Sequence, residues 1–184
     1  MFRGEKVLLR PMKREDIARQ HEFNQDPELY VLDCDYPRPT PIEVAQANYE
    51  NSVKKDGNTA HFAIEADGQY IGGITLMHLQ SRNRCAELGI MIGDHAFWGR
   101  GYGREAVKLM LDYGFGYLGL HRIELATHEK NVRAIRCYLA CGFIEEGRAS
   151  KVLWLQGEYV DVVQMSILHE EWQANRSWLP DLCE

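Results

Sequence analysis

The segment Trp98-Gly99-Arg100-Gly101-Tyr102-Gly103-Arg104 places three glycines and two arginines just before an amphipathic stretch. Glycines let a backbone turn tightly and approach a ligand closely, and the first amides of a helix have no helical partner. The helix dipole favours negative charge there, and Arg100 and Arg104 can add charge-assisted hydrogen bonds. The segment therefore predicts an anion site that suits a pyrophosphate.

Two other phosphate-binding motifs do not fit this segment. A P-loop ends in Gly-Lys-Ser/Thr, which is missing here. A dinucleotide-binding fold needs Gly-x-Gly-x-x-Gly and an acidic residue about 20 positions further on. Glu124 stands at roughly that distance, but the glycine spacing differs. Because glycine-rich turns before helices often serve packing alone, a purely structural role for the segment also stays open.

A second segment points to the same chemistry. Asn131-Val132-Arg133-Ala134-Ile135-Arg136-Cys137-Tyr138 is followed by Gly142-Phe143, and positions 131, 134 and 138 share one face of the expected helix. Together the two segments resemble the cofactor motifs of the GNAT superfamily of N-acetyltransferases. The resemblance covers residues 5–168 and is greatest to the RimJ/RimL group and to spermidine N-acetyltransferases. Three further stretches carry it: Ala86-Glu87-Leu88-Gly89-Ile90, Asp112-Tyr113-Gly114-Phe115 and Gly157-Glu158-Tyr159-Val160-Asp161.

This resemblance implies an enzyme that transfers an acetyl group from acetyl-CoA to a primary amine by direct attack in a ternary complex, without a metal. It also implies cofactor-binding residues. The strand backbone would bond the pantetheine arm, the glycine-rich loop would hold the pyrophosphate, and the start of the helix would contact the arm. The corresponding residues are Ile90, Met91, Ile92, Gly99, Arg100, Gly101, Tyr102, Gly103, Arg104, Asn131 and Ala134.

Two residues are candidates for proton transfer. Only a neutral amine attacks a thioester, and an alkyl amine with a pKa of ~10.4 is neutral in about one molecule per thousand at pH 7. Glu87 is the first candidate for a base acting through water, with a salt-bridged sheet residue as the alternative. Some family members carry a strand glutamate where this chain has Ala126. The resemblance makes Tyr138 the acid that protonates the departing thiolate, with a core aromatic as the alternative.

The acceptor stays open between a polyamine-like small amine, the α-amine of a protein N-terminus, and an amino sugar or antibiotic. The acidic stretch with Asp26, Glu28, Asp33 and Asp35 suits a cation, and equally suits a solvated loop. A noncatalytic acyl-CoA-binding module is the alternative of another class. A nucleotide-dependent oxidoreductase is a third.

Composition limits the partners and the compartment. The net charge of −6 argues against nucleic acid, because such binding depends on cationic side chains. We expect no membrane span, because no apolar run reaches bilayer length, and we expect no secretion signal. Five cysteines without paired metal-ligand spacing indicate free thiols in the cytoplasm. The oligomeric state stays open, with a homodimer among the alternatives.

The elements that must position these residues follow from hydrophobic periodicity. Strands are expected at 7–10, 61–65, 70–76, 85–92, 122–127, 150–155 and 159–168. Helices are expected at 15–25, 41–55, 105–117 and 131–140, with an irregular segment at 26–41. These elements predict a single α/β (α+β) domain of the GNAT fold over residues 5–168, with a C-terminal tail at 169–184. Its sheet would be mixed, mostly antiparallel and splayed, with helices on both faces.

Overall fold

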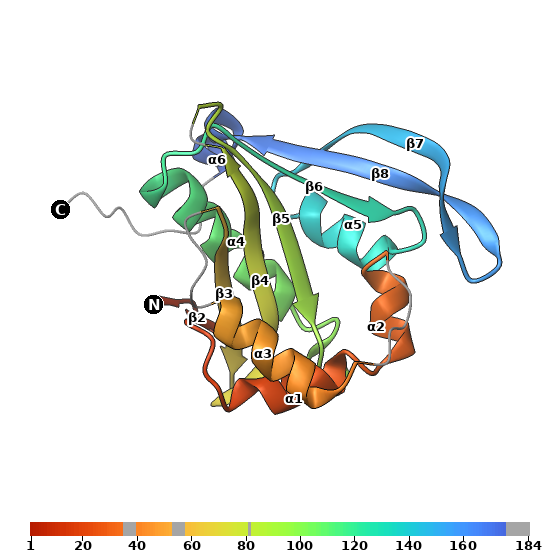
Figure 1. Ribbon diagram of the computed structural model, residues 1–184. Coiled ribbons are helices and arrows are strands. Elements are labelled where there is room, and N and C mark those ends of the chain that lie inside the picture. Colours follow the sequence, from red (N-terminus) through yellow and green to blue (C-terminus); the bar gives the residue numbers. More distant parts are fainter. Residues whose placement is uncertain (35–39, 53–57, 81, 176–184) are drawn as a thin grey trace.

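The computed structural model describes residues 1–34, 40–52, 58–80 and 82–175. They form one eight-stranded sheet in the order β1-β2-β3-β4-β5-β6-β8-β7 (Figure 1). The strands are β1 (Phe2–Arg3), β2 (Leu8–Arg10), β3 (Ala60–Ala66), β4 (Gln69–Gln80), β5 (Cys85–Ile92), β6 (Arg122–His128), β7 (Ile144–Leu155) and β8 (Glu158–Leu168). The α-helices are α1 (Asp16–Phe23), α2 (Pro27–Leu32), α3 (Ile42–Ser52), α4 (Tyr102–Asp112), α5 (Val132–Leu139) and α6 (His169–Asn175). A 3-10 turn, η1 (His95–Phe97), precedes α4, and a π-helix, η2 (Tyr113–Tyr117), follows it.

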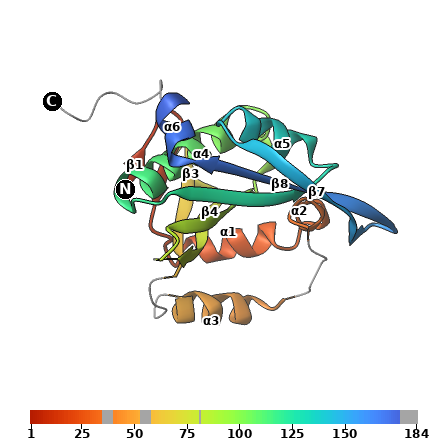
Figure 2. The same cartoon turned by 90° about the horizontal axis from the view of Figure 1, so that it is seen from above.

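The sheet is splayed between β5 and β6. These two strands run parallel and pair only through Cys85↔Arg122, Ala86↔Ile123 and Glu87↔Glu124, after which they separate. On its other edge β5 stays paired with β4 as far as Ile92. The result is a V that opens from an apex at Glu87 and Glu124, visible between β5 and β6 in Figure 1. Seen from above, α4 and α5 cover one face of the sheet while α1 and α3 cover the other (Figure 2). The predicted fold class is therefore confirmed.

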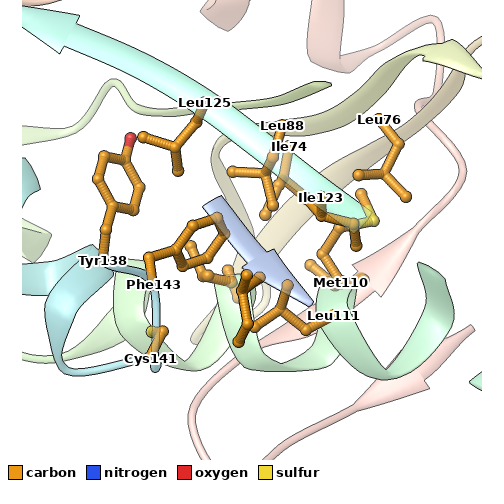
Figure 3. Packing of buried hydrophobic residues seen from close by; sticks show 14 of the residues in the cluster. Ile74, Leu76, Leu88, Met110, Leu111, Ile123, Leu125, Tyr138, Cys141 and Phe143 are labelled. Atoms are coloured by element: carbon orange, nitrogen blue, oxygen red, sulfur yellow. The ribbon is translucent and has the colours of Figure 1, made fainter. Parts of the chain in front are cut away.

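The main core fills the space between the sheet and α4. Side chains alternate across a strand, so Ile74, Leu76 and Leu88 point to the same face, where they meet Met110 and Leu111 of α4 (Figure 3). All five are at most 3% exposed. Burying one such side chain contributes on the order of 2 kcal/mol. This packing makes the sheet and α4 a firm support for the residues at the V.

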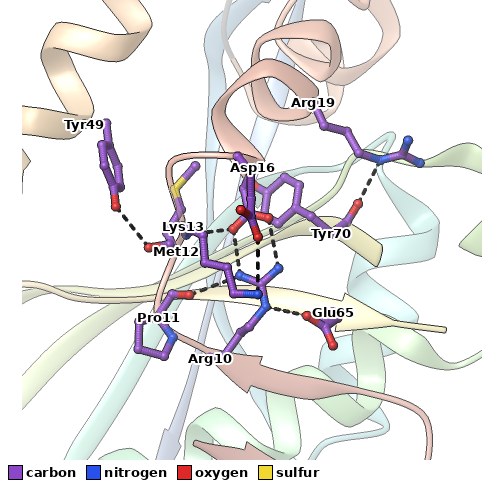
Figure 4. Close-up of polar contacts among 10 residues, drawn as sticks. Arg10, Pro11, Met12, Lys13, Asp16, Arg19, Tyr49, Glu65 and Tyr70 are labelled. Carbon is purple, nitrogen blue, oxygen red and sulfur yellow. Dashed lines mark hydrogen bonds and ion pairs between the residues drawn. The ribbon is translucent and has the colours of Figure 1, made fainter. Parts of the chain in front are cut away.

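A buried polar network fixes α1 against the sheet. Arg10, only 5% exposed, donates from Nη1 and Nη2 to the two carboxylate oxygens of Asp16 at 2.7 and 2.9 Å, and its Nε donates to Glu65 (Figure 4). Burial by itself would raise the pKa of Asp16, but the hydrogen bonds from Arg10 and from the amide of Lys13 outweigh it and lower that pKa. One guanidinium thus joins β2, α1 and β3.

Several elements differ from the sequence-based expectation. The segment expected to be irregular contains α2, because the Asp26 carboxylate accepts from the amide of Glu28 at 2.8 Å and Pro27 occupies the first helical position. The helix expected at 105–117 begins earlier, at Tyr102, and its last turn is the π-helix. The expected end of the helix at 41–55 lies outside the described residues.

The residues after 168 begin with α6. Trp172 is 2% exposed, and its indole Nε1 donates to Asp112 Oδ1 at 3.0 Å, so α6 packs against the end of α4. Residues 176–184 lie outside the described part, and the division of the chain at 168 stays a prediction. None of the described helices combines the length and the apolarity that crossing a bilayer requires.

Candidate active site

A cavity of about 570 Å³ occupies the V. Leu88 to Ile92 of β5 form one wall, Asn131 to Tyr138 of α5 contribute to the other, and the glycine-rich loop closes one end. The cavity brings together most residues that the sequence singled out: Ile90, Met91, Ile92, Gly99, Gly101, Tyr102, Gly103, Arg104, Asn131, Ala134 and Tyr138. Arg100 and Glu87 are not among the lining residues.

The glycine-rich loop leads directly into α4. Gly99 and Gly101 have φ of 70° and 89°, a left-handed backbone that favours glycine. Gly101 is the N-cap of α4, so the amides of the first helical turn have no helical acceptor and face the loop. The Arg100 side chain turns away and donates to the Ala96 carbonyl at 3.1 Å. Lys6 was not expected here from the sequence; its Nζ donates to the Arg100 carbonyl at 3.0 Å and adds a positive charge beside the loop.

The inner edge of β5 is the second feature of the cleft. Beyond Glu87 this edge has no strand partner among the described residues, so its outward amides and carbonyls face the cavity. An extended, amide-containing chain can bond such an edge as an added strand. The adjacent helix N-terminus suits a pyrophosphate. The free edge, the left-handed glycines and the cavity between them therefore fit the pantetheine and pyrophosphate of acetyl-CoA.

Tyr138 lines the cavity from α5. It is 7% exposed, and its ring packs against Phe143 with the ring centres 5.8 Å apart. In Figure 3 the hydroxyl extends from α5 toward Leu125 of β6. Burial raises the pKa of Tyr138, so the phenol stays protonated at neutral pH. A buried, protonated phenol in a cleft can donate a proton to a developing anion.

Asn131 is the N-cap of α5 and also ties that helix to α2. Its Oδ1 accepts from the amide of Ala134 at 3.2 Å, and its Nδ2 donates to the Leu32 carbonyl at 3.3 Å. The side chain is 8% exposed. These bonds place α2 beside the cleft, where Leu29, Leu32, Asp33 and Cys34 line the cavity. This wall was not expected from the sequence, although Asp26-Pro27-Glu28 is a helix-start signal. The expected contact of Asn131 with the cofactor stays a prediction.

Two acidic residues, Glu87 and Glu124, pair across the apex of the V. Glu124 accepts from Nε of Arg122 at 3.1 Å, and Arg122 also binds Glu146 through both terminal nitrogens. Glu87 Oε2 instead lies 3.0 Å from Nδ1 of His78, an imidazole that reaches it from a β-bulge in β4. Hence Glu124 is held by a permanent cation, whereas the partner of Glu87 is an imidazole. Glu87 adjoins Leu88 and Gly89, both of which line the cavity.

The described residues contain no group of three or more His, Cys, Asp or Glu side chains arranged to hold a metal ion.

Comparison with known proteins agrees with this geometry. The family model described as "Acetyltransferase (GNAT) domain" matches residues 6–144. The chain is 29% identical over 168 residues to spermidine N(1)-acetyltransferase of Escherichia coli K12, covering 91% of this chain and 89% of that protein. It is 25% identical over 162 residues to the E. coli K12 L-amino acid N-acetyltransferase AaaT, covering 87% and 96%.

A solved structure extends the comparison to three dimensions. The crystal structure of spermidine N-acetyltransferase from Vibrio cholerae in complex with CoA and spermine superposes with a TM-score of 0.84 at 27% identity. The match covers 92% of this chain and 99% of that one. The cofactor is therefore acetyl-CoA, as the loop and the β5 edge indicate. The chain belongs to the GNAT family and is an acetyl-CoA-dependent N-acetyltransferase.

Proposed function

We propose that this N-acetyltransferase acetylates a primary amine of a polyamine, with Glu87 as the base and Tyr138 as the acid. The observation that carries the proposal is the placement of Glu87 at the apex of the V, with an imidazole and not an arginine as its partner. Spermidine acetyltransferases are similar to this chain over nearly its whole length. A cytoplasmic location and a homodimeric assembly stay predictions from the sequence.

Two carboxylates at the cleft suit a polycation. Asp33 lines the cavity from the end of α2, and Glu87 stands beside the cavity on the other arm of the V. A protonated polyamine carries several positive charges, so one can be held by a carboxylate while a second amine loses its proton and attacks. The net charge of −6 acts in the same direction, because it attracts cations to the protein at long range.

Glu87 would take the proton from the attacking amine through a water molecule. Its carboxylate is 41% exposed, so water reaches it. Glu124 is a poorer base, because protonating it would break its ion pair with Arg122. The neutral amine then attacks the acetyl carbonyl directly, and the bond from that carbon to the sulfur breaks.

Tyr138 would donate its proton to the sulfur that leaves. Burial raises the pKa of Tyr138, which moves it away from the ordinary acidity of a thiol. The same burial disfavours a thiolate in the cleft, so the pKa values of the phenol and of the leaving thiol shift upward together. Proton transfer from the phenol therefore stays accessible at the moment when the thiolate forms.

The acceptor is tested by measuring thiol release from acetyl-CoA with spermidine, spermine, an amino sugar, free amino acids and short peptides. We expect kcat/KM for the polyamines to exceed that for every other class by at least about tenfold, which corresponds to about 1.4 kcal/mol in transition-state binding. Preference for an amino acid or a peptide would refute the polyamine assignment. Tight acetyl-CoA binding without thiol release across the panel would favour a noncatalytic acyl-CoA-binding module.

The base is tested with a matched pair of variants at the apex. Glu87→Gln should lower kcat with spermidine by about a hundredfold, because general base catalysis contributes on that order. The deficit should be largest below neutral pH, where the free amine is scarcest. Glu124→Gln removes the neighbouring carboxylate and should leave kcat unchanged. Equal effects of the two variants would remove Glu87 from the mechanism.

A further inference from the structure

Trp98 lies between two other side chains at the mouth of the cofactor cleft. The His95 ring stacks on the indole with a centroid distance of 3.8 Å and an interplanar angle of 20°. The guanidinium carbon of Arg133 lies 3.6 Å from the centroid of the same indole. Because each contact is a close stack on a ring face, the two groups occupy opposite faces of Trp98.

The indole is also anchored to the cofactor wall. Its Nε1 donates to the carbonyl of Ile92 at 2.7 Å. Ile92 ends β5, and its carbonyl belongs to the backbone edge that faces the V. Trp98 therefore sits on the stretch of β5 along which the pantetheine arm is expected to lie, near the end occupied by the pyrophosphate loop.

The contact with Arg133 crosses the V. Trp98 follows β5, whereas Arg133 is the second residue of α5 on the opposite arm, and both line the cavity. Trp98 also packs against the small hydrophobic cluster that contains Phe23 of α1 and Leu29 of α2. The crossing therefore lies on the α1 and α2 side of the sheet, and the start of α4 lies on the other side.

The stack of His95, Trp98 and Arg133, called the bridge below, is also connected to α2 by a hydrogen bond. His95 Nε2 lies 2.7 Å from Oδ2 of Asp26, the N-cap residue of α2. Desolvation beside the indole lowers the pKa of Arg133, while attraction to Glu28 opposes that shift. A guanidinium that has lost part of its hydration binds an aromatic face more strongly than an exposed one.

We propose that Trp98 and Arg133 close the cleft over the pantetheine arm and thereby hold acetyl-CoA in position for transfer. The stack of His95, Trp98 and Arg133 forms one side of the closed cleft, and the guanidinium of Arg133 links it to the opposite side of the V. Trp98 and Arg133 are positioning residues in this role, because neither reaches the acetyl group. The role depends on the established cofactor and not on the identity of the acceptor amine.

The test measures how fast the cofactor leaves. Arg133→Met keeps the length of the side chain and removes its charge, and since Arg133 lies at the surface this change spares the core. Trp98→Gln removes the indole, and Trp98→Phe keeps a ring but loses the bond to Ile92. Stopped-flow displacement would give the dissociation rates of CoA and of 4′-phosphopantetheine, which has the same arm without the nucleotide. We expect Arg133→Met and Trp98→Gln to raise both rates by about tenfold, the size of a partly desolvated cation–π contact.

A double variant and a distant tryptophan complete the experiment. If the residues act as one unit, the double variant Trp98→Gln/Arg133→Met should release CoA no faster than Trp98→Gln alone. Trp154, which is 59% exposed on β7 and pairs with Tyr159, serves as the control, and Trp154→Gln should leave both rates unchanged. An unchanged rate in folded Arg133→Met would overturn the proposal. So would a faster release of CoA with no change for 4′-phosphopantetheine, because the bridge would then act on the nucleotide.

Discussion

Replacing Tyr138 with phenylalanine removes one oxygen atom and keeps the ring. The ring packs against Phe143, and Tyr138 lines the cavity. The change should therefore lower the free energy of unfolding by less than about 1 kcal/mol, the usual contribution of one hydrogen bond. If the phenol protonates the leaving thiolate, turnover should fall by about ten- to a thousandfold, equivalent to about 1.4 to 4 kcal/mol in the barrier.

The assay compares two acyl donors on one preparation of each protein. With acetyl-CoA, Tyr138→Phe should show the full loss in kcat and a nearly unchanged Kd for the cofactor. With a donor whose leaving thiol is more acidic, the loss should shrink, because that thiolate departs with less need of a proton. Since burial raises the pKa of Tyr138, the phenol keeps its proton up to at least pH ~10. At any pH below that, loss of this proton should not reduce kcat of the parent enzyme. Equal losses with both donors, or none with either, would refute the role.

Three further variants, with one control variant, test the loop and the buried groups. Gly101→Val places a side chain at φ 89°, which costs about 1 to 2 kcal/mol. This variant should bind acetyl-CoA more weakly, as measured by calorimetry. The control Gly68→Val, at φ 76° in the β3–β4 turn, carries similar strain and should bind acetyl-CoA with the affinity of the parent. Asp16→Asn leaves Arg10 buried with a weaker partner and should lower unfolding stability by about 3 to 5 kcal/mol at pH 7. Because the pKa of Asp16 is lowered in the folded protein, the stabilisation by its carboxylate is present above pH ~4 and is lost as pH falls. The Tm values of the parent and of Asp16→Asn should therefore converge in thermal unfolding at acidic pH. Burial raises the pKa of Tyr70, so its contribution is present below pH ~10 and lost above it, and Tyr70→Phe should flatten the alkaline loss of Tm.

The parts of the fold with local periodicity were predictable from the sequence. The strand expected at 85–92 has the same bounds in the structure, and Asn131 starts α5 as its pattern indicates. The hairpin at Asp67-Gly68 is confirmed by the left-handed φ of 51° and 76° at these residues. In each case, residues within a few positions of one another determine the conformation. The same reasoning failed for α2, because a six-residue helix is too short to show a period among prolines and tyrosines.

The parts of the site that depend on distant residues were not predictable. The bond from His78 to Glu87 exists because a β-bulge in β4 turns His78 into a left-handed conformation with φ 52°. The stack of His95, Trp98 and Arg133 joins residues from two arms of the sheet that meet only in the folded protein. Lys6 reaches the loop across 94 positions of sequence. Hydrophobic periodicity and composition do not predict which residues distant in sequence come into contact.

The three-residue pairing between β5 and β6 divides the sheet into two blocks. β1 to β5 lie side by side in chain order in the first block, β6, β8 and β7 form the second block, and all strand pairing within each block is antiparallel. Each block can thus open separately, and hydrogen exchange should resolve two cooperative units in the free protein. A cofactor lying in the V touches both blocks and should slow exchange in both together. Acetyl-CoA would then act as a cross-link between two folding units as well as the donor of the acetyl group.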